Sequence, residues 1–267
     1  MNQVQEKRSS NNILVGLETH DGYIIEMVYS FKSKCLCIST QIGCTTGCRF
    51  CASGSKGFVR NLSSEEMFEE YQFFIERGYE IEILHFGGVG EPLRNLDNIL
   101  EFKKQIYVKT TQLTTSMPNE ESFRRICKSN FDILIVSLHS TNEKTRKYLF
   151  SNSMSLPEII ALLVEITADQ PYLKNIIRIS YLLLGDMNTS EKEQDEFIAL
   201  AEQLDLCLLL LGYNKVNDED IFITDMQIYL RLLKKIRKNS IRYEDCVCSL
   251  SRRDIIGGCG TLYVSSN

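Results

Sequence analysis

Short runs of consecutive apolar residues alternate with amphipathic segments along most of this chain. Five of these runs predict buried strands, because they are short, rich in aliphatic side chains and followed by polar or glycine-containing segments. They lie at residues 80–88, 106–116, 131–140, 176–185 and 204–213. A further strand is predicted near residues 34–39.

The amphipathic segments between these runs predict helices. Two of them begin with capping signals: Ser63 stands before a pair of glutamates in one, and Ser190 precedes Glu191 in another. Strands that alternate with helices favour parallel βα units, and we count about six, fewer than the eight of a closed barrel. The predicted helices lie at residues 64–77, 96–104, 120–128, 141–149, 156–168, 190–203 and 223–238.

The start of the chain predicts a β-hairpin. The runs "ILVGLETH" and "YIIEMVYSF" are joined by Asp21-Gly22, a strong two-residue turn signal. Residues 1–12 are polar, and we expect them to be disordered or extended. Residues 13–267 contain no internal repeat, low-complexity tract or linker, so we expect them to form a single domain.

Composition is that of an ordinary globular protein, with 43% hydrophobic and 24% charged residues. No apolar stretch approaches the roughly eighteen residues of a membrane span. The polar N-terminus lacks the apolar region of a secretion signal, so a cytoplasmic location is expected. The net charge of −5 does not favour phosphate binding, although residues 231–242 hold six basic side chains and no acidic one. A solvated helix face is the simpler interpretation of that segment.

Ten cysteines are present, and five of them lie between Cys35 and Cys51. A reducing cytosol disfavours disulfides, so metal ligands and reactive thiols are the expected roles. Cys44, Cys48 and Cys51 form a CxxxCxxC pattern, and thiolates bind soft metals. Zinc would require a fourth ligand, whereas three cysteines on a [4Fe–4S] cube would leave one iron open. The candidates for a fourth zinc ligand are Cys35, Cys37, His85 and His139.

A second motif, "HFGGVGEPL", follows the predicted strand at 80–88. Its glycines allow the backbone to approach a ligand closely, although a plain tight loop would have the same composition.

The cysteine pattern, placed at the opening of a βα series, resembles the radical SAM superfamily, which binds S-adenosylmethionine (SAM) at the open iron of a [4Fe–4S] cluster. More specifically, the chain is similar to the RlmN/Cfr family of radical SAM RNA methyltransferases over about residues 23–262. The matching segments are "LCISTQIGCTTGCRFCASGSKGFVRNLSSEEM", "FGGVGEPLRN", "SLHS" with the following Asn142 and Arg146, "GYN" and "DIIGGCGTL". The resemblance implies a partial (β/α)6 TIM-like barrel of the radical SAM type.

The resemblance also implies a methyl-shuttle chemistry at carbon 2 or carbon 8 of adenine, using two SAM molecules. Cys259 matches the cysteine that accepts a methyl group from the first SAM. A 5′-deoxyadenosyl radical from the second SAM removes a hydrogen from that methyl group, and the resulting radical adds to the base. Cys37 matches the cysteine that then forms a transient disulfide and releases the product. Glu26 matches the proposed general base, although a solvent-facing strand position is the alternative.

Further residues match family positions that contact SAM. Glu91 corresponds to the residue that binds the SAM amino group, and the full set is Gly90, Glu91, Thr114, Ser137, Leu138, His139 and Asn214. The resemblance implies RNA as substrate, a flavodoxin or ferredoxin as electron donor, and no membrane partner. Among the remaining cysteines, Cys127 and Cys207 are expected to be buried thiols. Cys35, Cys246 and Cys248 match no motif position.

The chain departs from the family pattern in three places, all of them related to substrate choice. Only twelve residues precede the predicted hairpin, so we expect a short form without the family's N-terminal accessory domain. The segment "FSNSMSL" replaces a Pro-Ile-Asn type of segment, and Cys248 and Arg252 stand where Arg and Gly are usual. Two hypotheses therefore remain: methylation of an adenine in ribosomal or transfer RNA, or the same chemistry on a peptide or small aromatic heterocycle.

Overall fold

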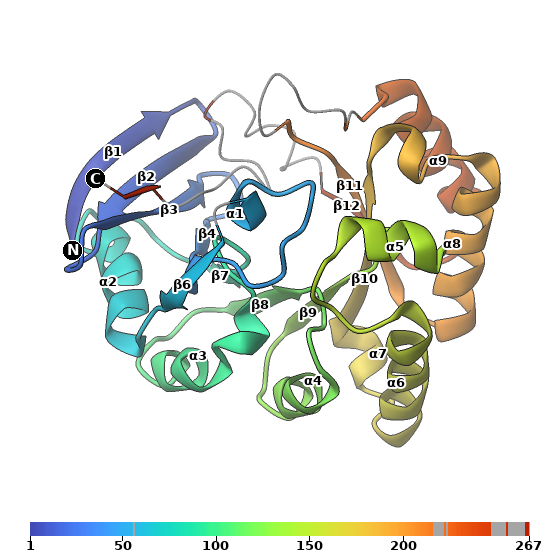
Figure 1. Cartoon of the computed structure of the whole chain (residues 1–267), viewed down its shortest axis with the longest axis horizontal. Helices are drawn as coiled ribbons and strands as arrows, with labels where there is room; N and C mark the ends of the chain where they lie inside the picture. The colour runs from blue at the N-terminus through green and yellow to red at the C-terminus, as the bar shows by residue number, and fades with distance from the viewer. Residues whose placement is uncertain (56, 216–221, 223, 247–254, 256–264, 267) are drawn as a thin grey trace.

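The computed structural model describes the whole chain except residues 56, 216–221, 223, 247–254, 256–264 and 267. In the part described, one eleven-stranded sheet dominates, with the order β1-β2-β3-β4-β7-β8-β9-β10-β11-β12. The eleventh strand, β13 (Ser265–Ser266), is paired to β3. The sheet curves into an open arc, with helices covering its outer face (Figure 1). None of the helices within the described ranges combines the length and hydrophobicity needed to cross a lipid bilayer.

The sheet has an antiparallel beginning and a parallel remainder. Strands β1 (Asn2–Arg8), β2 (Asn12–Glu18) and β3 (Tyr23–Ser30) form a meander, and β3 also pairs antiparallel with β4 (Cys35–Ile38). From β4 onward the pairing is parallel. The parallel strands that follow are β7 (Ile83–Phe86), β8 (Thr110–Thr115), β9 (Ile133–Ser137), β10 (Ile177–Leu183), β11 (Cys207–Gly212) and β12 (Tyr243–Cys246).

All the helices expected from the hydrophobic pattern are present, with ends shifted by a few residues. They are α2 (Ser64–Ile75), α3 (Leu96–Lys103), α4 (Glu120–Cys127), α5 (Glu143–Leu149), α6 (Leu156–Asp169), α8 (Glu191–Leu204) and α9 (Met226–Lys238). The expected caps are also confirmed: Ser63 forms a capping box with Glu66, and the Ser190 side chain accepts from the Glu193 N–H. Short elements α1 (Ala52–Ser55) and α7 (Leu173–Ile176) were not expected.

Two edge strands of the main sheet and the separate β5–β6 pair were not predicted as strands, because these segments are short or mostly polar and lack alternation. Strand β1 is exposed along most of its length and is extended because it pairs with β2. Strand β12, "YEDC", pairs with β11 at the opposite edge. Strands β5 (Gln41–Gly43) and β6 (Phe58–Asn61) form a separate antiparallel pair around the cysteine loop. Tertiary pairing, and not local propensity, makes these segments strands.

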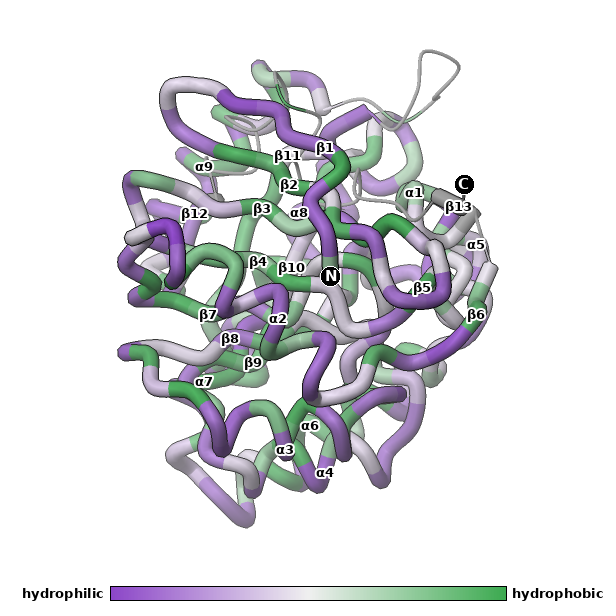
Figure 2. The backbone as a smooth tube through the Cα atoms, turned by 90° about the vertical axis from the view of Figure 1, so that its left-hand side faces the viewer, coloured by the Kyte–Doolittle hydropathy of each residue, from purple (hydrophilic) through white to green (hydrophobic). Residues whose placement is uncertain are grey.

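The two faces of the parallel strands differ in polarity. On β7, Phe86 points toward the helices and contacts Phe102 of α3 at a ring-centroid distance of 6.0 Å. The preceding residue, His85, therefore faces the interior of the arc. Figure 2 shows hydrophobic residues concentrated on the inner strands and hydrophilic ones on the outer turns of the helices. Register places several polar or reactive residues on the interior face: Cys37 beside His85, and Ser137 beside Ser180.

Candidate active site

The three clustered cysteines occupy one loop between β5 and β6. The loop is closed at its base by a hydrogen bond from the Cys44 N–H to the Gly57 carbonyl (2.9 Å). Gly54 packs against Cys48 so tightly that a Cβ there would lie 2.7 Å from the Cys48 carbonyl oxygen. Cys44, Cys48 and Cys51 are half-buried free thiols. The loop therefore presents three unbridged sulfurs in a compact backbone.

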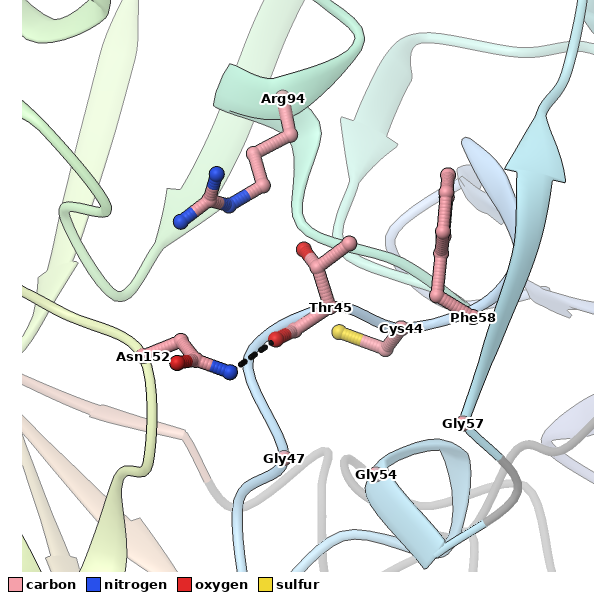
Figure 3. Close-up of a pocket in the computed structure, with 8 residues that line it drawn as sticks. All are labelled: Cys44, Thr45, Gly47, Gly54, Gly57, Phe58, Arg94 and Asn152. Carbon is pink, nitrogen blue, oxygen red and sulfur yellow. Dashed lines mark hydrogen bonds between the residues drawn. The ribbon is translucent and has the colours of Figure 1, made fainter.

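The cysteine loop contacts the segment 149–153, which begins at the last residue of α5. Four hydrogen bonds join the two segments: Arg49 N–H to Leu149 O (3.1 Å), Asn152 N–H to Thr46 O (3.1 Å), Asn152 Nδ2 to Thr45 O (2.8 Å) and Ser151 Oγ to Gly47 O (3.1 Å). A cavity of about 530 Å³ opens beside the loop, bordered by Cys44, Arg94 and Asn152 (Figure 3). The loop is thus held in place from one side and is accessible from another.

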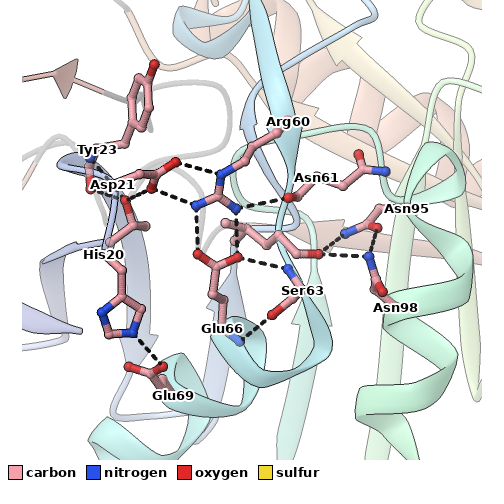
Figure 4. Close-up of polar contacts among 12 residues, drawn as sticks. His20, Asp21, Tyr23, Arg60, Asn61, Ser63, Glu66, Glu69, Asn95 and Asn98 are labelled. Carbon is pink, nitrogen blue, oxygen red and sulfur yellow. Dashed lines mark hydrogen bonds and ion pairs between the residues drawn. The ribbon is translucent and has the colours of Figure 1, made fainter.

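Strand β6 anchors the far end of the loop. The Arg60 guanidinium pairs with Asp21 in the β2–β3 turn (2.7 Å) and with Glu66 of α2 (2.8 Å), as Figure 4 shows. The same guanidinium lowers the pKa of the Asp21 carboxyl well below its usual range. Asn95 donates to the carbonyls of Thr40 (2.7 Å) and Leu62 (2.8 Å) on either side of the loop. The cysteine loop is therefore fixed to the N-terminal meander and to the helix layer.

The thiols of the loop must lose their protons before they can bind a metal. Burial raises the pKa of Cys44 to about 11 and raises that of Cys48 well above its usual value. The charge of Arg146 acts in the opposite direction on Cys48. Because metal ligation requires thiolates, binding of a metal at this loop releases protons.

The donor set fits an iron–sulfur cluster better than a single zinc ion. No group of three or more His, Cys, Asp or Glu residues in the described ranges is spaced to hold one metal ion. The two candidate histidines are engaged elsewhere: His85 Nε2 lies 2.8 Å from Thr114 Oγ1, and His139 Nδ1 lies 3.0 Å from the Ser180 carbonyl oxygen. Three soft sulfur donors without a fourth match a cube with one open iron.

Gly90 and Glu91 lie in the segment that follows β7, between its last residue, Phe86, and the short helical turn that begins at Pro92. Gly90 has a φ of +117°, and a Cβ there would lie 2.6 Å from Thr40 Oγ1, so only glycine fits. The buried Glu91 carboxylate accepts hydrogen bonds from the hydroxyls of Thr115 (2.7 Å) and Ser116 (2.6 Å) and from two backbone N–H groups. Thr46 of the cysteine loop lies 3.3 Å from the same Ser116 hydroxyl. Glu91 thus joins two strand ends and the loop, and its contact with the SAM amino group stays a prediction.

His139 follows Ser137 and Leu138 at the end of β9 and is fully enclosed. It adopts a φ of +59°, and its ring lies 5.3 Å from Phe50 and 5.5 Å from Phe150. Phe50 stands between Cys48 and Cys51 in the chain, so His139 packs directly on the cysteine loop. Burial lowers the pKa of His139 to about 3, which keeps the ring neutral at physiological pH.

A pH-dependent stability is expected from this buried histidine. An unfolded histidine titrates near pH 6.5, so between about pH 6.5 and 3 the unfolded state binds a proton that the native state does not. The contribution of the neutral histidine to the free energy of unfolding is therefore complete above about pH 6.5. It falls as the pH decreases toward about 3, by up to about 1.4 kcal/mol per pH unit. Denaturant unfolding of the reduced apoprotein at several pH values measures this slope. His139→Gln should flatten it, whereas His20→Gln, at an exposed site, should not; equal slopes in all three proteins would contradict the assignment.

Cys37 and Glu26 lie on the same interior face, in diagonal positions of the neighbouring antiparallel strands β4 and β3. Cys37 is opposite Val28, and Glu26 is two residues further along the same face of β3. Both side chains are buried, at 4% and 3% exposure, so the solvent-facing alternative for Glu26 is wrong. Cys35 lies on the same face, two residues from Cys37, and is also buried.

The remaining expected residues are distributed along the strand ends. Thr114 is the penultimate residue of β8, and Asn214, which is 1% exposed, lies two residues after β11. Cys127 and Cys207 are confirmed as buried thiols, each at 5% exposure or less. Cys259 and Cys248 lie outside the described residues. Residues 231–238 belong to the amphipathic helix α9, whose apolar face is buried, as expected.

One buried residue of this region was not singled out from the sequence as part of the site. Arg146 on α5 is 1% exposed and donates to the carbonyls of Ser137 (2.7 Å), Leu138 (3.0 Å) and Ser116 (3.0 Å). Its position in the motif that begins at Ser137 was visible, but nothing in the sequence indicated complete burial. The one signal in the sequence is an arginine nine residues after Ser137, the last residue of the strand β9.

Comparison with known proteins relates this site to a family. The sequence profile of the radical SAM superfamily matches residues 38–155, which include all three loop cysteines and Glu91. The chain is 30% identical, over 94% of its length, to a protein of Finegoldia magna named "Probable dual-specificity RNA methyltransferase RlmN". It covers 74% of that relative. The chain belongs to the RlmN family of radical SAM methyltransferases.

Other members and structures of this class agree. A "Dual-specificity RNA methyltransferase RlmN" of Oleidesulfovibrio alaskensis is 32% identical over 76% of the chain, which spans 61% of that relative's length. The crystal structure of a radical SAM methyltransferase from Sphaerobacter thermophilus superposes with a TM-score of 0.82 at 24% identity, covering 98% of this chain and 80% of that one. The expected α/β radical SAM fold is thereby confirmed, with an open and mostly parallel sheet.

Membership of the RlmN family also identifies the cofactors. Radical SAM enzymes use a [4Fe–4S] cluster and SAM, and the three-thiol loop fits such a cluster. Cys44, Cys48 and Cys51 are the residues that would hold it.

Proposed function

We propose that this chain methylates carbon 2 or carbon 8 of an adenine in ribosomal or transfer RNA through a methyl-cysteine shuttle. The observation that carries the proposal is the position of Cys37. It is a buried thiol on the interior face of β4, separate from the three-cysteine loop and on the same face as Glu26 of the neighbouring strand. The names of the RlmN relatives support RNA as the substrate class.

Each step assigns a task to a side chain of this protein. The cluster with its bound SAM supplies the radical that activates a carbon–hydrogen bond. Cys259, as a thiolate, accepts a methyl group from SAM and carries it to the base. Glu26 takes the proton from the ring carbon that is methylated. The adduct would return one electron to the cluster as Glu26 takes this proton. The Cys37 thiolate then attacks the sulfur of Cys259, and a disulfide forms as the carbon–sulfur bond breaks. The electron pair of that bond stays on the methylene carbon, which takes up a proton and becomes the methyl group, and a thiol reductant reopens the disulfide.

The interior face provides the surroundings that this sequence of steps requires. Gly90, Glu91, Thr114, Ser137, Leu138, His139 and Asn214 lie at or just after the carboxyl ends of β7, β8, β9 and β11, where open α/β sheets bind ligands. These residues would hold SAM between the cysteine loop and Cys37. A flavodoxin or ferredoxin would supply the electron that reduces the cluster.

Isotope labelling tests the proposed substrate directly. Cells that express the chain with methyl-deuterated methionine should contain a deuterated methyladenosine in ribosomal or transfer RNA, and cells that express Cys44→Ala should not. Nucleoside mass spectrometry of both RNA pools makes the measurement. If no new methyladenosine appears while the purified protein still cleaves SAM, the RNA assignment is wrong and a peptide or small heterocycle becomes the substrate class to test.

A further inference from the structure

Arg146 is a buried cation whose hydrogen bonds go to neutral oxygens. Nη1 donates to Ser137 O (2.7 Å) and Leu138 O (3.0 Å), and Nη2 donates to Ser116 O (3.0 Å) and Ser153 Oγ (3.2 Å). Its Nε–H finds no partner among the described residues. The guanidinium therefore ties the ends of β8 and β9 to the segment after α5, and it retains one donor.

No carboxylate forms a salt bridge with Arg146 in the part of the chain that the structure describes. Burial lowers its pKa to about 10, so it remains charged at neutral pH. A buried charge without a counter-ion is energetically costly. Glu143, an acidic residue on the same helix, is instead paired with Lys147 at 3.2 Å.

Packing connects the guanidinium to the cysteine loop as well. The Phe150 ring lies 4.5 Å from the Arg146 guanidinium carbon, and Phe50 of the loop meets Phe150 edge-on at 5.4 Å. The segment that Arg146 holds to the strand ends is also the one that bears the loop's four hydrogen bonds. The cation is thus placed beneath the loop by contacts on both sides.

We propose that Arg146 is a positioning residue for the iron–sulfur cluster and supplies the fixed positive charge that sets its reduction potential. Three thiolates give the cluster site a negative charge, and one electron from the external donor adds another. A cation in a low-dielectric interior stabilises the more negative, reduced form more than the oxidised one. Net charge and hydrogen bonding around a cluster are known determinants of its potential. The inference depends on the cluster, and not on which substrate the enzyme methylates.

Redox titration of the reconstituted protein, without SAM or RNA, tests this role. Wild-type protein, Arg146→Gln and Arg146→Lys would be titrated while electron paramagnetic resonance measures the reduced cluster. We expect Arg146→Gln to weaken the reduced form at least tenfold, a shift to lower potential of about 59 mV for a one-electron couple. Arg146→Lys keeps the charge and should stay within tenfold of wild type. Arg94→Gln, an exposed cation that also borders the loop, should shift little because solvent screens its charge.

Iron and sulfide content and circular dichroism would establish that each variant carries a full cluster in a folded protein. A fully loaded Arg146→Gln with the wild-type potential would overturn the proposal. So would an Arg146→Lys protein that shifts by more than tenfold, because charge would then not be the determinant. If Arg146→Gln fails to fold, the reduction potential of Arg146→Lys still tests the proposal. Ser153→Ala, which removes one hydrogen bond and no charge, gives the shift caused by geometry alone.

Discussion

Cys44→Ala is expected to lose the iron–sulfur cluster and, with it, all cleavage of SAM. Three thiolates from one loop are the only protein ligands assigned to the cube, and the loop is fixed by Arg60, Asn95 and the 149–153 segment. A replacement ligand therefore cannot move into the vacated position without breaking those contacts. After anaerobic reconstitution with iron and sulfide, the variant should lack the visible absorbance of the cluster. Chromatography of the reaction with SAM and dithionite should detect no 5′-deoxyadenosine.

Cys127→Ala provides the matched control for this experiment. This variant makes the same cysteine-to-alanine change outside the loop. Cys127 lies on α4, in the helix layer, and is 4% exposed. Its loss removes one small apolar group from the core and should leave cluster content and 5′-deoxyadenosine formation near wild type. If Cys44→Ala retained SAM cleavage, Cys44 would not be a ligand, and the assignment of the CxxxCxxC loop would have to be abandoned.

Cys37→Ala is expected to trap the enzyme on its substrate. In the proposed sequence of steps, the base is attached to the Cys259 sulfur until Cys37 attacks that sulfur. Without the Cys37 thiol the covalent link should persist, because the disulfide that releases the base can form only when a second thiolate reaches the Cys259 sulfur. The variant should therefore stop within the first turnover, with RNA attached to the protein. Denaturing gel electrophoresis with labelled RNA measures the adduct, and mass spectrometry of the digested protein locates it.

Two further proteins make this result specific. Cys35→Ala changes a buried thiol on the same face of the same strand, two residues away, and should turn over without accumulating an adduct. The double variant Cys37→Ala/Cys259→Ala should form no adduct at all, because the methyl-accepting sulfur is missing. An adduct in the double variant would contradict the role of Cys259, and normal product release by Cys37→Ala would mean that another group resolves the link.

Much of the fold could be predicted because its signals are local. Residues 131–140 and 204–213 are short aliphatic runs between amphipathic segments, and both became central strands, β9 and β11. The exceptions lie at the sheet edges and around the loop. The polar segments "NQVQEKR" and "YEDC" carry no strand signal of their own and are strands only because a neighbouring strand supplies hydrogen-bond partners.

The candidate site likewise has some features that the sequence predicts and others that it does not. The spacing of Cys44, Cys48 and Cys51 and the glycines before Glu91 are encoded within a few residues, so the sequence by itself determined the metal-binding loop and the family. It could not determine that Glu91 is shared by two strand ends or that the His139 ring packs against Phe50 and Phe150. Nor could it determine that Arg146 is buried with no carboxylate partner in the described part of the chain. Those properties depend on residues that are brought together from β7, β8, β9 and α5. Only the tertiary structure decided them, because burial and charge pairing arise from contacts between distant segments, whereas ligand spacing within one loop is written in the chain.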